Sequence, residues 1–72
     1  MKMRIEYANG RKTEVDNEDA AREIIDAKYP DAEYGDWQQS GYAPARMLIW
    51  ADAASAVEDD GQHAVAAIYK TA

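Results

Sequence analysis

Apolar residues occupy every second position from Met3 to Tyr7, with charged residues between them, and a similar alternation resumes over residues 11–16. A period of two is typical of strands that bury one face. The dipeptide Asn9-Gly10 lies between the two segments and is a common turn sequence. The pattern therefore predicts a β-hairpin at the start of the chain.

The register of this hairpin follows from the length of its loop. A three-residue loop over residues 8–10 places Ile5 opposite Thr13 and keeps the apolar side chains on one face. A two-residue loop would place Ile5 opposite the charged Glu14. Because a slip of one residue turns a whole strand over, we predict the three-residue loop. Gly10 then has a positive φ, which glycine adopts without steric cost.

Residues 17–29 change to the spacing of a helix, in which one face recurs every 3.6 residues. The apolar positions of this face are Ala21, Ile24, Ile25 and Tyr29. Asp16 and Asn17 are both suitable N-caps. Pro30 ends the helix, because the residue before a proline is disfavoured in the α conformation.

Three further segments complete the expected sheet. Residues 31–40 alternate with a slip near Gly35, as a β-bulge would produce. Residues 46–51 are apolar on both faces, which indicates a central strand. Residues 62–70 fit either a strand or a second helix. Their alanines and aliphatic residues match both the two-residue period of a strand and the 3.6-residue period of a helix. We favour the strand, because the segment at 46–51 needs neighbours.

The sequence thus predicts an α+β fold, in which a single helix packs on an antiparallel sheet in the order β-β-α-β-β-β. The alternative is that the last element, residues 62–70, is a second helix. The 72 residues form one small domain.

Charge and composition narrow the range of partners. The net charge is −6, yet residues 1–12 carry +3 and the other sixty carry −9. A chain this acidic is poorly suited to binding nucleic acid or an anionic membrane. It is attracted to a basic protein surface. The chain has no cysteine and no apolar run near the ~20 residues that span a bilayer. We expect a cytoplasmic protein.

Catalytic motifs are missing from the sequence. Ser40 and Ser55 do not lie in a glycine-framed nucleophile turn, and His63 is the only imidazole available to activate them. Nucleophilic catalysis requires a nucleophile, a base and an orienting group together. We therefore expect a protein that is not an enzyme and has no cofactor.

Three consecutive carboxylates, Glu58, Asp59 and Asp60, precede Gly61 and form a candidate acidic surface. Asp52 could approach them and complete a hard-metal or small-ligand site, since such cations prefer several oxygen ligands. The spacing does not match a calcium-binding loop. A solvated turn explains the same residues.

The segment from Tyr34 to Tyr42 is the candidate partner-binding site. It combines amphipathic aromatic side chains with small and polar residues, a mixture enriched in protein contacts. The candidate residues are Tyr34, Asp36, Trp37, Gln39 and Tyr42. The alternative is that these aromatic residues form the core of a small domain.

Three functions are compatible with these features. The first is a small acidic domain that acts through protein–protein interaction, as an inhibitor or as a nucleic-acid-mimicking decoy for a basic partner. The second is a domain that binds a small ligand or hard metal through Asp52 and residues 58–60. The third is a homodimeric structural protein.

Overall fold

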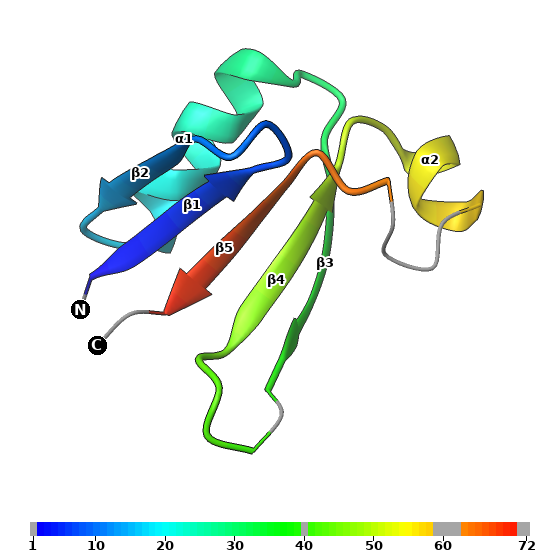
Figure 1. Cartoon of the computed structure of the whole chain (residues 1–72). Coiled ribbons are helices and arrows are strands. Elements are labelled where there is room, and N and C mark those ends of the chain that lie inside the picture. The colour runs from blue at the N-terminus through cyan, green and yellow to red at the C-terminus, as the bar shows by residue number, and fades with distance from the viewer. Residues whose placement is uncertain (1, 40, 59–62, 71–72) are drawn as a thin grey trace.

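The computed structural model describes residues 2–39, 41–58 and 63–70 (Figure 1). Within these residues, five strands and two helices follow one another as β-β-α-β-β-α-β. The strands are β1 (Met3–Tyr7), β2 (Lys12–Val15), β3 (Glu33–Gln38), β4 (Arg46–Trp50) and β5 (Ala66–Lys70). The helices are α1 (Glu18–Lys28) and α2 (Ala53–Glu58). The predicted α+β class is confirmed.

The last strand lies in the middle of the sheet. The strand order is β2-β1-β5-β4-β3, and every neighbouring pair is antiparallel. Thus β5 joins the hairpin of β1 and β2 to the hairpin of β3 and β4. The alternative of a helix at the end of the chain is wrong, because residues 66–70 pair on both sides as a strand.

The register of the first hairpin matches the prediction. Ile5 pairs with Thr13 and Met3 with Val15. The amide of Tyr7 donates to the carbonyl of Arg11 at 2.8 Å, which closes the three-residue loop. Gly10 has a φ of 92°. The apolar side chains of both strands therefore share the face that carries the core.

Helix α1 begins after Asn17, whose side-chain oxygen accepts a hydrogen bond from the amide of Ala20 at 2.8 Å. This bond satisfies one of the free amides at the start of the helix. Of the two predicted caps, the structure uses Asn17. Ala21 and Ile25 are completely buried against the sheet, as the helical spacing predicts.

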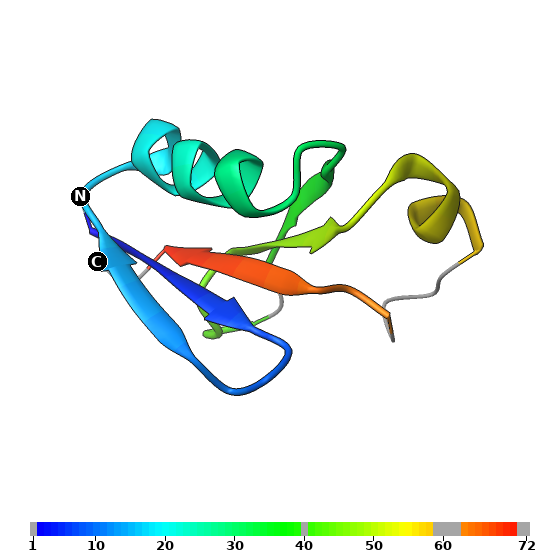
Figure 2. The same ribbon diagram turned by 90° about the horizontal axis from the view of Figure 1, so that it is seen from above.

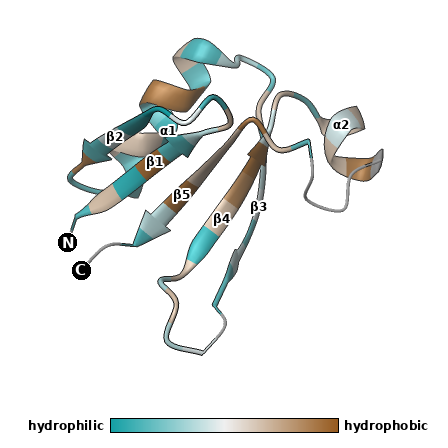
Figure 3. Cartoon of the chain, in the orientation of Figure 1, coloured by the Kyte–Doolittle hydropathy of each residue, from teal (hydrophilic) through white to brown (hydrophobic). Residues whose placement is uncertain are grey.

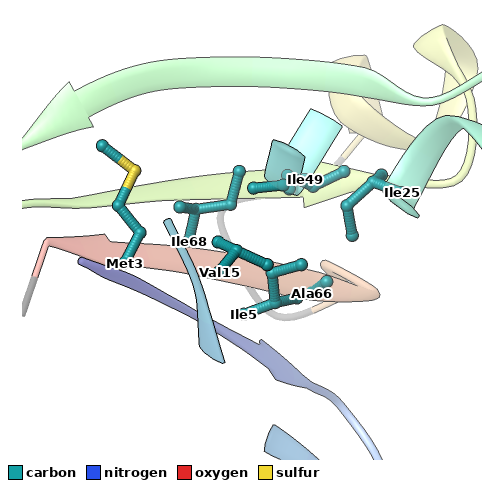
Figure 4. Close-up of a cluster of buried hydrophobic side chains, with 8 residues drawn as sticks. Met3, Ile5, Val15, Ile25, Ile49, Ala66 and Ile68 are labelled. Carbon is teal, nitrogen blue, oxygen red and sulfur yellow. The ribbon is translucent and has the colours of Figure 1, made fainter. Parts of the chain in front are cut away.

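The core lies between α1 and one face of the sheet. Its largest completely buried side chains are Ile5, Ile25, Ile49 and Ile68. Figure 4 shows Ile25 of α1 beside side chains from the strands. Burying a side chain of this size stabilises the fold by about 1.5–3 kcal/mol, so these four provide a large share of the stability.

The prediction of a single helix is corrected by α2, which lies beyond the end of β4 (Figure 1). Asp52 caps it, with its Oδ1 accepting from the Ser55 amide at 2.7 Å. Six residues make fewer than two turns, so the segment shows no helical period in the sequence. Its alanines favour a helix, but this preference alone is weak.

The two faces of the sheet differ. In Figure 2, α1 lies along one face, and no helix of the described residues lies on the opposite side. The strand β4 is interior in the strand order, as predicted, but a helix covers only one of its two apolar faces. No helix in the described parts of the chain combines the length and the apolar character that crossing a membrane requires.

We predict that Asn17→Ala lowers the free energy of unfolding by about 1 kcal/mol, because α1 loses its cap. Asp16→Ala is the matched control and should cost less than half as much, since the structure gives Asp16 no role in the cap. Urea unfolding of both variants measures the difference. A larger loss for Asp16→Ala would contradict the observed cap.

Candidate functional site

The face of the sheet opposite α1 has an unusual composition. An antiparallel sheet with one uncovered face normally alternates apolar residues inside with polar residues outside. Strand β1 follows this rule, with Arg4 and Glu6 outside, whereas β4 and β5 place large apolar side chains there. We define the apolar centre of this outer face by four residues: Leu48, Trp50, Ala67 and Tyr69.

The pairing of the strands places Leu48 and Ala67 at the middle of the apolar centre, with Tyr69 toward one end and Trp50 toward the other. Leu48 lies opposite Ala67, and Arg46 lies opposite Tyr69. Leu48, Trp50 and Tyr69 remain partly exposed, although β4 and β5 are interior strands. Figure 3 shows β4 strongly hydrophobic toward its end, whereas β1 alternates along its length.

Two hollows open beside the Tyr69 ring, and Tyr69 belongs to the wall of both. The first, of about 250 Å³, is called the Arg46 hollow, and it is lined by Gln38, Gln39, Ala43, Pro44, Arg46 and Tyr69. The second, of about 230 Å³, lies over alanines beside Leu48 and Glu6. Because small alanine side chains lie next to large ones such as Tyr69 and Leu48, the surface of this face is uneven.

Two arginines flank Tyr69 on its neighbouring strands, since both Arg4 and Arg46 are paired with it. Arg4 lies 5.5 Å from the centroid of the Tyr69 ring and forms an ion pair with Glu6 at 2.7 Å. Arg46 is exposed, and its side chain has no hydrogen bond or ion pair within the described residues. No described side chain therefore neutralises the positive charge of Arg46.

Tyr34 points to α1 and not to the outer face. Its hydroxyl donates to Oδ1 of Asp26 at 2.6 Å and lies 3.3 Å from the carbonyl oxygen of Arg22. The Arg22 guanidinium lies 4.3 Å from the ring centroid. Burial, and then the hydrogen bond to the Asp26 carboxylate, raise the pKa of Tyr34 above its ordinary value.

Trp37 makes a second link between β3 and α1. Its indole Nε1 donates to Oε1 of Glu18 at 3.2 Å, and the Lys70 ammonium lies 4.5 Å from its ring centroid. The same carboxyl group of Glu18 holds Arg22 at 2.9 Å. Two of the five candidate partner-binding residues, Tyr34 and Trp37, thus connect the edge strand to the helix.

The other three candidates do not join them on one surface. Asp36 is exposed in the bulge of β3, where the register with β4 shifts between Tyr34 and Trp37. Gln39 lines the Arg46 hollow. Tyr42 is fully exposed in the loop between β3 and β4.

The proposed acidic and metal-binding residues are only partly described. Glu58 ends α2, and Asp59 and Asp60 lie outside the described residues. The amide of Ser55 holds the pKa of Asp52 below its ordinary value, because its hydrogen bond stabilises the carboxylate. No three metal-ligating side chains gather within residues 2–39, 41–58 and 63–70. The metal or ligand site stays a prediction.

Carboxylates gather instead on the helix side of the molecule. Residues 16–31 carry six acidic and two basic side chains, a net charge of −4. Asp19, Glu23 and Asp26 are exposed and follow each other at helical spacing, so they form one stripe on α1. Both basic residues of the segment lie over tyrosine rings, Arg22 over Tyr34 and Lys28 over Tyr7.

No family model matches the chain, and it has no match among curated proteins or solved structures. The comparisons identify no family. Any proposal of function must therefore rest on the chemistry of the two surfaces, the outer face of the sheet and the stripe on α1.

We predict that Gly35→Ala disturbs the apolar centre. An added Cβ would lie 3.0 Å from Cζ3 of Trp50 and 3.2 Å from the carbonyl oxygen of Leu48. Because the carbonyl belongs to a paired strand, the indole must move, at a cost of about 1–2 kcal/mol in unfolding free energy. The indole N–H resonance of Trp50 should shift while that of Trp37 stays in place, and the opposite result would contradict this packing.

We predict that Tyr34→Phe lowers the unfolding free energy by about 1 kcal/mol at neutral pH, because the hydrogen bond to Asp26 is lost. The raised pKa of Tyr34 makes its contribution complete below the ordinary value of 10.0. The contribution declines at higher pH, because the unfolded chain then releases a proton that the folded chain retains. Urea unfolding from neutral to alkaline pH should show the difference between wild type and variant shrink above that value, and a constant difference would contradict it.

Proposed function

We propose that this chain is a non-enzymatic protein-interaction domain and that its contact surface is the outer face of the sheet. The apolar centre is the observation that supports this proposal. The face of an antiparallel sheet that no helix covers is normally polar, but here its middle is apolar. A patch of large apolar side chains rimmed by polar ones is typical of a protein contact.

The residue types on this face support the same function. Tryptophan, tyrosine and arginine contribute most often to the energy of protein interfaces. Tyr69 lies between Arg4 and Arg46 on this face, and Trp50 lies at the other end of β4. The hollows beside Tyr69 can receive side chains of a partner, which improves packing at the contact.

A rough energy balance shows what the apolar centre can supply. Leu48, Trp50 and Tyr69 are already half-buried, so complete burial gives about 1 kcal/mol each, or about 3 kcal/mol in total. The loss of freedom on association costs at least about 4 kcal/mol. Stable binding therefore requires polar contacts around the apolar centre, and the two arginines are placed to make them.

A second candidate is the decoy for a basic partner. The stripe of Asp19, Glu23 and Asp26 supports it, because the cations near these carboxylates are placed over aromatic rings. In this version the helix side imitates the charge of nucleic acid. A cytoplasmic location stays part of the proposal.

Photo-crosslinking distinguishes the two surfaces. A photoreactive phenylalanine derivative is incorporated at position 69 on the outer face, or at position 23 on α1, and each variant is irradiated in a lysate of the source organism. We expect a partner to be captured from position 69 and not from position 23. Circular dichroism of both variants verifies that they fold.

Each result has a distinct meaning. A basic protein captured only from position 23 would favour the decoy and contradict the outer face. Crosslinks between two copies from position 69 would show a homodimer in place of a separate partner. The absence of any crosslink from both positions would contradict the interaction function.

A further inference from the structure

The Arg46 hollow combines one positive charge, two amides and an apolar wall. Gln38 and Gln39 come from the end of β3 and the residue after it, and Pro44 comes from the loop that leads into β4. Gln39 donates from Nε2 to the carbonyl oxygen of Ala43 at 3.4 Å, across the loop. A side-chain amide has two N–H donors, so Gln39 keeps one for a ligand.

The charge at this hollow is positive although the protein is acidic. Arg46 has no partner among the described residues, whereas Arg4 on the other side of Tyr69 is neutralised by Glu6. The acidic stripe belongs to α1, on the opposite side of the sheet (Figure 2). A helix with its side chains is about 10–12 Å across, and salt screens solvent-exposed charges over about 8 Å. The carboxylates of α1 therefore have little effect at the hollow.

The size of the hollow favours side chains over a complete small molecule. Its volume of about 250 Å³ is below the ~300–1,000 Å³ of typical ligand pockets. It is also open to the surface of the sheet, next to the apolar centre. A chain segment that lies across this face can place one side chain in the hollow and a neighbouring one on Tyr69.

We infer that the Arg46 hollow binds an acidic peptide segment of a partner protein, in which an Asp or Glu carboxylate is adjacent to a large apolar side chain. The carboxylate pairs with the Arg46 guanidinium, a planar group that fits a carboxylate with two parallel hydrogen bonds. The free N–H groups of Gln38 and Gln39 donate to the same carboxylate. The apolar side chain packs on Tyr69 and Pro44. This inference rests on the proposed function, and it adds that the partner is acidic where it touches the sheet.

Selection from a phage library of short random peptides tests the partner chemistry without a known partner. The full chain is immobilised as wild type, as Arg46→Gln and as Arg11→Gln. Arg11→Gln is the matched control, because it removes the same charge from an exposed arginine on the far side of β1 and β5. Wild type and Arg11→Gln should enrich peptides with Asp or Glu beside Leu, Phe, Tyr or Trp, and Arg46→Gln should not.

Binding of the most enriched peptide is then measured by amide NMR titration. We expect shifts at Gln38, Gln39, Arg46 and Tyr69. Arg46→Gln should weaken binding about tenfold or more, as should replacing the peptide's carboxylate with its amide, and Arg11→Gln should change it less than about twofold.

The outcomes separate this inference from the proposed function. Enrichment of basic or neutral peptides that bind the outer face would overturn the acidic partner and leave the interaction function intact. Peptides that bind only elsewhere, or no enrichment at all, would contradict both. If N-acetylglutamate alone binds as tightly as the peptide, the hollow is a site for small anions and the inference of a peptide partner is wrong.

Discussion

The whole fold depends on the pairing of β5 with both hairpins. Ile68 lies in register between Ile5 of β1 and Met47 of β4, and all three are buried. Without this strand the two hairpins have no common neighbour, since β1 and β4 do not pair directly. The sheet, and with it the surface that α1 covers, can be completed only when the last described strand is in place. Pairing between segments so far apart in the sequence is expected to slow folding, because the entropy of closing the loop must be overcome before the contacts form.

The same strand creates the outer face. A strand alternates its side chains, so a β5 that buries Ala66 and Ile68 under α1 must turn Ala67 and Tyr69 to the other side. Tyr69 then lies between the arginines of the two neighbouring strands. The site proposed for a partner is thus a direct consequence of the pairing that builds the core.

The sequence predicted the strand register best where a wrong register would bury a charged side chain. The register of β1 and β2 followed because a slip would place Glu14 on the apolar face. The last strand stayed ambiguous, since alanine-rich segments satisfy both periods and only the pairing with β1 and β4 decides between them. The sequence did not lead to the outer face as a candidate site, although the apolar residues of that face can be seen in it. The two apolar faces of residues 46–51 correctly predicted a central strand, but α1 covers only one of these faces.

The aromatic residues show why the candidate site is centred on Tyr69 and not on Tyr34 and Trp37. Tyr34 and Trp37 sit on β3, an edge strand that pairs with a neighbour on one side only. Their hydrogen bonds to Asp26 and Glu18 attach β3 to α1 and occupy their polar groups. Tyr69 lies on the central strand, which is already held on both edges. Its ring is therefore not needed to anchor the strand, and it remains partly exposed where a partner can reach it.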